Sequence, residues 1–209
     1  MKHYIYTSLL LLTSTFFSCN HTKETKVKEL SNYALSAKDS PVAARKSHSA
    51  TPWIIDATPS KVEFTIKNLG INVNGSFKGL VGTVFFDDKN LEGSSIEGTI
   101  EVNTINTGIT KRDKDLMGEK FFDAEKNKRI IFKSTSITRK GSSYNASGNL
   151  TIKGTTKQKV IPFTFEQKGN NGVFKGNFTI NRRDFGVGGN EVIMADELNV
   201  SLSIVVKKK

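Results

Sequence analysis

The residue types that most often carry enzyme chemistry are confined to one short part of this chain. The three histidines, His3, His21 and His48, and the single cysteine, Cys19, all precede Trp53. The chain from Trp53 onward therefore offers neither a Ser–His nor a Cys–His nucleophile pair, and it lacks the usual zinc ligands. We predict no metal site and no cofactor in it.

Carboxylates are the remaining candidates for acid–base chemistry. Asp113 with Asp115, and Asp123 with Glu125, form closely spaced pairs in the lysine-rich stretch Lys111 to Lys128. We expect this stretch to be solvated, which favours ordinary surface charges over a tuned acid and base. The run Gly186-Val187-Gly188-Gly189 lacks the strand–loop–helix context of a phosphate-binding loop and predicts a flexible turn. We predict that the protein is not an enzyme.

The net charge of +11 raises the question of a nucleic-acid partner. Up to Pro52 there are seven basic and three acidic residues, and Lys207 to Lys209 add three more positive charges. Between Trp53 and Val206 the 21 basic residues nearly balance 17 acidic ones. The excess lies largely in the two ends, where basic residues solubilise a chain or contact anionic lipid. We therefore predict no nucleic-acid binding.

A short apolar run near the N-terminus predicts export. Lys2 and His3 precede the run Tyr4 to Phe17, which is shorter than the ~20 residues of a membrane-spanning helix and is typical of a signal peptide. It ends in Phe16-Phe17-Ser18-Cys19, which resembles a bacterial lipobox, with Phe16 where Leu is usual. We expect residues 1–19 to be a lipoprotein signal peptide and Cys19 to carry the lipid. An ordinary signal peptide with an incidental Cys19 is the alternative.

Residues 20–52 differ in composition from the rest of the chain. They are rich in Lys, Ser, Thr and Ala without apolar periodicity, which predicts a flexible tether to a domain at residues 53–209. Together with the predicted signal peptide, this arrangement predicts secretion across the inner membrane and lipid anchoring in the bacterial envelope, on its periplasmic or surface face.

From Trp53 onward, apolar and polar residues alternate with the period of a β-strand. About eight such runs are present: 62–67, 76–86, 96–103, 129–139, 144–153, 159–167, 174–180 and 198–206. One-sided alternation predicts antiparallel strands, packed as a sandwich or closed into a barrel that holds side chains or one slender ligand. Lys111 to Lys128 predicts one or two short helices, and Asn170-Asn171-Gly172 suits a hairpin turn.

Several segments in register resemble the YceI-like family of periplasmic lipid-binding proteins. They are Trp53–Asp56, Val62–Lys67, Val73–Gly79, Ile105–Gly108, Arg112-Asp113, Leu116, Phe121–Asp123, Ile131–Thr135, Gly148–Gly154 and Arg183–Gly186. Two departures are Asn68, where the family usually has histidine, and Lys128-Arg129, where it often has proline. The resemblance implies an all-β fold, an antiparallel lipocalin-like barrel of about eight strands with a short helical insert. It also implies binding, storage or transfer of an isoprenoid lipid, such as an isoprenoid quinone or a polyprenyl carrier.

Phenylalanine supplies the candidate lining of such a lumen, since the chain has 14 Phe against one Trp and four Tyr. We expect the ligand to contact Phe64, Ile66, Phe77, Phe132, Phe163, Phe165 and Phe178, with Phe121 and Phe122 near a mouth. Asn68, Arg112 and Arg183 are candidate head-group contacts. Capping and ion pairing that fix the helical insert are the alternative role of the two arginines.

Two further functions stay open from the sequence. One is a structural or interaction lipoprotein whose barrel is filled by its own side chains. The other is a carbohydrate-binding sandwich, which the scarcity of Trp and Tyr disfavours. A homodimer through exposed strand edges also remains open.

Overall fold

The computed structural model describes residues 50–209, which belong to one compact unit, Lys46–Lys209. The predicted signal peptide, Cys19 and nearly all of the predicted tether lie outside the described residues. The strands are β1 (Pro52–Asn68), β2 (Ile71–Phe77), β3 (Val81–Phe85), β4 (Ser95–Glu101), β5 (Arg129–Lys140), β6 (Ser143–Ile152), β7 (Thr155–Lys168), β8 (Asn171–Asn181) and β9 (Met194–Lys208). The helices are α2 (Thr110–Met117) and two 3₁₀ turns, η1 (Val102–Thr104) and η2 (Arg182–Phe185).

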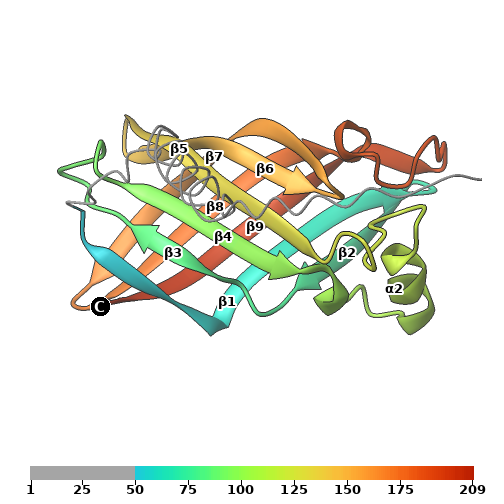
Figure 1. Cartoon of the computed structure of the whole chain (residues 1–209), viewed down its shortest axis with the longest axis horizontal. Helices are drawn as coiled ribbons and strands as arrows, with labels where there is room; N and C mark the ends of the chain where they lie inside the picture. Colours follow the sequence, from blue (N-terminus) through green and yellow to red (C-terminus); the bar gives the residue numbers. More distant parts are fainter. Residues whose placement is uncertain (1–49) are drawn as a thin grey trace, which may run out of the picture. The chain divides into compact units, whose positions relative to one another are not determined.

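The strands close into an antiparallel barrel (Figure 1). The sheet runs β2-β1-β3-β4-β5-β6-β7-β8-β9, and pairing of β1 with β9 closes it. Strands β2 and β3 share one edge of β1, because Val62–Asn68 pair with β2 whereas Pro52 and Trp53 pair with β3. The two short strands thus occupy one of eight positions in the wall. The predicted all-β barrel with a short helical insert is confirmed.

The long strand β1 bends where it changes neighbours. Its register with β9 shifts between Asp56 and Lys61, around Pro59, which has no N–H to donate to the sheet. The Ser60 hydroxyl restores the bonding, since it donates to the Asp56 carbonyl at 2.6 Å and accepts from the Val205 N–H at 3.0 Å. The bulge therefore curves the wall without leaving these backbone groups unpaired.

Four of the hairpins, β1–β2, β5–β6, β6–β7 and β7–β8, turn in two residues each. Leu69-Gly70 joins β1 to β2 with φ of 49° and 77°, and Lys153-Gly154 joins β6 to β7 with φ of 48° and 72°. The turn that we placed at Asn170-Asn171-Gly172 lies earlier, at Gly169-Asn170, since β8 begins at Asn171. Gly172 is needed within the strand instead, because a Cβ there would lie 2.5 Å from the Phe165 ring.

An aromatic cluster fills the end of the barrel where β1 begins. Phe86, which follows β3, is 1% exposed, and its ring centroid lies 5.0 to 5.7 Å from those of Tyr144, Phe163, Phe165 and Phe174. Trp53 donates its indole N–H to the Phe86 carbonyl at 3.0 Å. We call these six residues the aromatic plug. The opposite end carries α2 (Figure 1).

Candidate functional site

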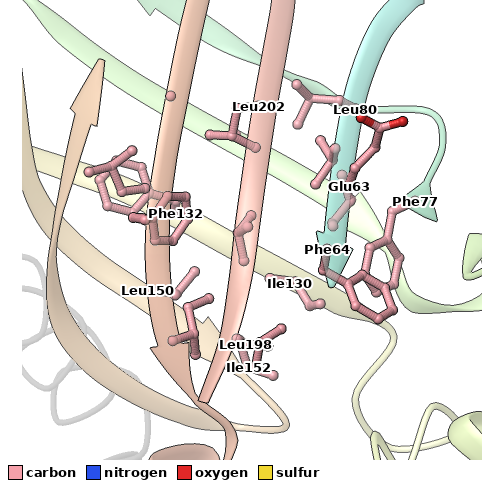
Figure 2. A pocket seen from close by; sticks show the side chains of 18 of the residues that line it. Glu63, Phe64, Phe77, Leu80, Ile130, Phe132, Leu150, Ile152, Leu198 and Leu202 are labelled. Atoms are coloured by element: carbon pink, nitrogen blue, oxygen red, sulfur yellow. The ribbon is translucent and has the colours of Figure 1, made fainter. Parts of the chain in front are cut away.

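A cavity of about 290 Å³ occupies the barrel between the aromatic plug and α2. Its wall is almost wholly apolar, because the inward positions of every strand carry aliphatic or aromatic side chains. Figure 2 shows Leu150, Ile152, Leu198 and Leu202 on one side of this space and Phe64 and Phe77 on the other. We call this cavity the lumen.

The lumen is elongated along the strands. Strand β9 alone contributes Leu198, Val200, Leu202 and Ile204, which are alternate residues on one face. Six residue steps at about 3.3 Å each span about 20 Å along the strand. The strict alternation thus builds a channel that suits a long, slender apolar molecule better than a compact one.

Eight of the nine residues expected to contact a ligand line the lumen: Phe64, Ile66, Phe77, Phe121, Phe122, Phe132, Phe163 and Phe178. Phe165 does not line it. Its ring lies 4.5 Å from that of Phe174 and 5.2 Å from that of Trp53, so it packs within the plug. The lumen therefore ends before Phe165.

The insert after α2 covers part of the other end with apolar side chains. Leu116, Phe121 and Phe122 line the lumen, and the Phe122 ring meets the Phe77 ring edge-to-face with centroids 6.0 Å apart. The Lys153 ammonium, in the β6–β7 turn, links the insert to the residue after η2. It donates to the carbonyls of Glu119 at 2.8 Å and Gly186 at 3.0 Å. The insert is thus tied to the barrel through the Phe122 ring and through the Glu119 carbonyl.

Arg112 brings a cation to this end of the lumen. Its Nε and Nη2 donate to the hydroxyl and carbonyl oxygens of Thr107 at 2.8 and 2.7 Å, and Asp113 in turn accepts the N–H and hydroxyl of Thr107. Within residues 50–209, Arg112 makes no ion pair and its Nη1 has no hydrogen-bond partner. The guanidinium is therefore fixed in place with one N–H₂ group left free to donate.

Asn68 adds an acceptor at the same end. It lines the lumen where β1 ends, and its side-chain Oδ1 is buried without a hydrogen-bond partner in the described part of the chain. A buried oxygen left unpaired costs about 1 to 3 kcal/mol, so a ligand that donates to it would recover that energy. A free donor and an unpaired acceptor thus lie at one end of an otherwise apolar channel.

The two neighbouring arginines of η2 have different environments. Arg183, expected as a head-group contact, is exposed and does not line the lumen; its Nε donates to Asp196 instead. Arg182 is the inward residue, with a side chain 2% exposed that donates to the carbonyls of Ala195, Val187, Gly189, Glu191 and Met194 and to Asp196. The sequence held a signal for this, since Arg182 continues the inward series Phe178, Ile180 along β8.

Other kinds of site find no support in the described residues. Between residues 50 and 209, no group of three or more His, Cys, Asp or Glu side chains is placed to hold a metal ion. No helix in that range is long and apolar enough to cross a membrane. The carboxylate pairs considered above, Asp113 with Asp115 and Asp123 with Glu125, are absent from the lumen wall.

Comparison with known families explains the architecture. The YceI-like domain matches residues 53–206, which is nearly the whole barrel. The chain belongs to the YceI-like family. The UPF0312 protein of Yersinia pestis (strain Pestoides F) is 31% identical over 150 residues, which cover 68% of this chain and 78% of that protein. The segments from Trp53 to Gly186 quoted above are thus parts of one YceI-like domain.

Solved structures agree with this YceI-like barrel. BcnA of Burkholderia cenocepacia is 30% identical, with a TM-score of 0.69 over 72% of this chain and 98% of BcnA. A polyisoprenoid-binding domain from Saccharophagus degradans, implicated in plant cell wall breakdown, is 14% identical. Its TM-score is 0.60 over 75% of this chain and 98% of that domain, which shows a shared fold.

Proposed function

We propose that this YceI-like protein binds a long isoprenoid lipid in its lumen, and stores or transfers it in the bacterial envelope, rather than catalysing a reaction. The observation that carries the proposal is an elongated, almost wholly apolar lumen with the free donor of Arg112 and the unpaired acceptor of Asn68 at one end. The family membership supports it, as does the fold shared with a domain named for polyisoprenoid binding. The predicted lipid anchor at Cys19 would hold the barrel at the membrane that supplies the ligand.

Burial of the tail supplies the binding energy. Each CH₂ group taken from water contributes about 0.8 kcal/mol, so a five-carbon isoprene unit contributes about 4 kcal/mol before the costs of association. The tail has no polar groups, so the apolar wall beside it needs no hydrogen-bond donors or acceptors. Such a lumen selects for slender, apolar molecules. Discrimination between head groups depends on Arg112 and Asn68 at the open end.

The size of the lumen argues against a barrel filled by its own side chains. An apolar cavity of about 150 Å³ binds benzene and stays dry, and this lumen has about 290 Å³. That space takes the first part of a long tail. The rest would need additional space, which ring rotations of the lining Phe residues would provide.

The polar end favours a head group that carries oxygen. The free Nη1 of Arg112 donates to a quinone carbonyl or a phosphate oxygen, and Asn68 Oδ1 accepts from a hydroxyl. Isoprenoid quinones and polyprenyl phosphates offer an acceptor to Arg112, and the quinol and polyprenol forms also offer a hydroxyl to Asn68. We propose these two classes as ligands, with the head at Arg112 and the tail toward the plug.

Native mass spectrometry of the segment Lys46–Lys209 tests the proposal. The segment contains the closed sheet and Ala50, whose side chain is buried, so it retains the complete barrel. We expect protein purified from a bacterial host to carry an extra mass that organic extraction identifies as an isoprenoid lipid. A ligand-free protein that also fails to take up added ubiquinone and polyprenol from detergent micelles would refute the proposal.

Replacement of Arg112 tests the orientation of the ligand. Arg112→Met keeps the length of the side chain but removes the donor, and we expect affinity for ubiquinone or a polyprenyl phosphate to fall about tenfold, which corresponds to one charge-assisted hydrogen bond. A plain long-chain alkene, which has no head group, should bind equally to both proteins. Equal binding of the quinone by both proteins would place its head group elsewhere. Affinities follow from titration in detergent micelles.

A further inference from the structure

Five exposed apolar side chains surround the open end of the lumen. Leu69 and Ile71 of the β1–β2 hairpin are 70% and 71% exposed, Val192 before β9 is 90% exposed, and Ile193 and Ile109 are about half exposed. The segments that hold them also supply Asn68, Arg112 and Met194 to the lumen wall. We call these five residues the apolar rim. Ile54, Val81 and Val160, the remaining exposed large apolar residues of the described chain, lie on other parts of the barrel wall.

Part of the apolar rim is a continuous edge. The Leu69 N–H donates to the Ile193 carbonyl at 2.7 Å, and Asn68 pairs with Met194 at the start of β9. The hairpin tip and the segment before β9 are therefore held side by side. Single exposed apolar residues are ordinary, whereas a group beside a cavity indicates a binding surface.

Leu69 occupies a turn position whose backbone conformation is unfavourable for leucine. Its φ of 49° lies in the left-handed region, where Asn, Asp or Gly is the usual first residue of a two-residue hairpin turn. Its side chain is mostly exposed, so burial within the chain does not compensate. Neither backbone preference nor core packing accounts for an apolar residue here, and such an exception indicates a role outside the fold.

The charges beside the apolar rim are mainly positive and would not repel an anionic surface. Lys67, Lys111 and Lys114 are exposed near it, with Asp115 as the exposed acid of α2. The segment before β9 carries one acid, Glu191, which is ion-paired with Lys120. The hydrogen bond and charge of Lys120 hold the pKa of Glu191 below its ordinary value, so the pair persists at neutral pH without net charge.

We propose that the apolar rim inserts into the surface of a lipid bilayer, so that the lumen opens directly onto the acyl chains. The inference rests on the proposed function, because a tail that dissolves in the bilayer then passes into the lumen without crossing water. The exposed lysines face the headgroups, and the apolar side chains lie at the acyl boundary.

Flotation with vesicles of phosphatidylcholine and phosphatidylglycerol tests the proposal on Lys46–Lys209, which excludes any lipid at Cys19. We expect Leu69→Asn with Val192→Ser to reduce the vesicle-bound fraction at least fivefold. Because Asn suits the left-handed turn, Leu69→Asn alone should melt at the same or a higher temperature, which separates docking from folding. The matched control, Ile54→Ser with Val160→Ser, removes two exposed apolar side chains outside the apolar rim and should float like the parent.

A second measurement separates this proposal from the ligand assignment. Both double variants should take up ubiquinone from detergent micelles like the parent, whereas the rim variant should take it up from vesicles at least fivefold more slowly. Docking is refuted if the parent does not float, if both double variants lose flotation equally, or if the apolar rim instead mediates a dimer in sedimentation. Rim-dependent flotation without uptake from micelles would refute the proposed ligand and leave docking intact.

Discussion

Gly98→Trp should empty the barrel of lipid. Gly98 is an inward residue of β4 that lines the lumen and pairs with Phe132 of β5. A Cβ at this position would meet only the Leu80 side chain, at 3.5 Å, which is an ordinary contact. The backbone at Gly98 can therefore carry a side chain, and an indole there would project into the lumen and fill the space of the tail. We expect the bound lipid found by native mass spectrometry to fall at least tenfold, because most of the burial energy per CH₂ is lost.

The neighbouring residue supplies the control. Thr99 lies on the opposite face of the same strand and does not line the lumen, so Thr99→Trp adds the same ring to the outer surface. It should retain the lipid. A graded series at Gly98, Ala then Leu then Trp, should lower occupancy with side-chain volume. Full occupancy in Gly98→Trp would show that the lipid is held outside the lumen.

Arg182→Met should cause the largest loss of stability. The guanidinium of Arg182 is buried and donates to five backbone carbonyls and Asp196. Three of these acceptors lie between η2 and β9, and the other three lie at the start of β9. Methionine fills similar space but leaves these acceptors without donors. We expect the free energy of unfolding in guanidinium chloride to fall by at least about 3 kcal/mol. Arg182→Lys should recover only part of this loss, since one ammonium cannot reach all the acceptors that surround the planar guanidinium.

Arg183 is the matched control for this substitution. Its ion pair with Asp196 joins side chains that are 40% and 41% exposed, and such pairs contribute about 0 to 1 kcal/mol. Arg183→Met should therefore unfold at nearly the same denaturant concentration as the parent. Equal losses in the two variants would mean that the hydrogen bonds of Arg182 do not organise this end of the barrel.

The strand pattern predicted most of the fold because one face of each strand is buried, which imposes the period of two on the sequence. The same pattern could not show that 76–86 is two strands, since the break at Lys78–Leu80 depends on Gly79 in the left-handed region, with φ of 68°. It also placed the β7–β8 turn too late. The Asn-Gly pair there resembles a turn locally, whereas Gly172 is required by the Phe165 ring across the hairpin.

The site was predictable to the extent that alternation decides which side chains face inward. Phe64, Phe132 and Phe178 follow directly from it. Where the lumen ends does not follow, because Phe163 and Phe165 alternate identically and both pack against Phe86, yet only Phe163 also lines the lumen. The choice of Arg183 over Arg182 came from the family-like motif, although the alternation along β8 favours Arg182.

The aromatic plug gives the lumen one closed end, so a molecule in it enters and leaves through the same opening. A tail must enter first and leave last through the same opening, so the protein cannot pass a molecule through from one side to the other. In the proposed orientation the head group stays outermost throughout, and it is the part that a receiving membrane or enzyme would meet. Delivery from such a tube is the reverse of loading, and its direction depends only on whether donor or acceptor holds the lipid more weakly.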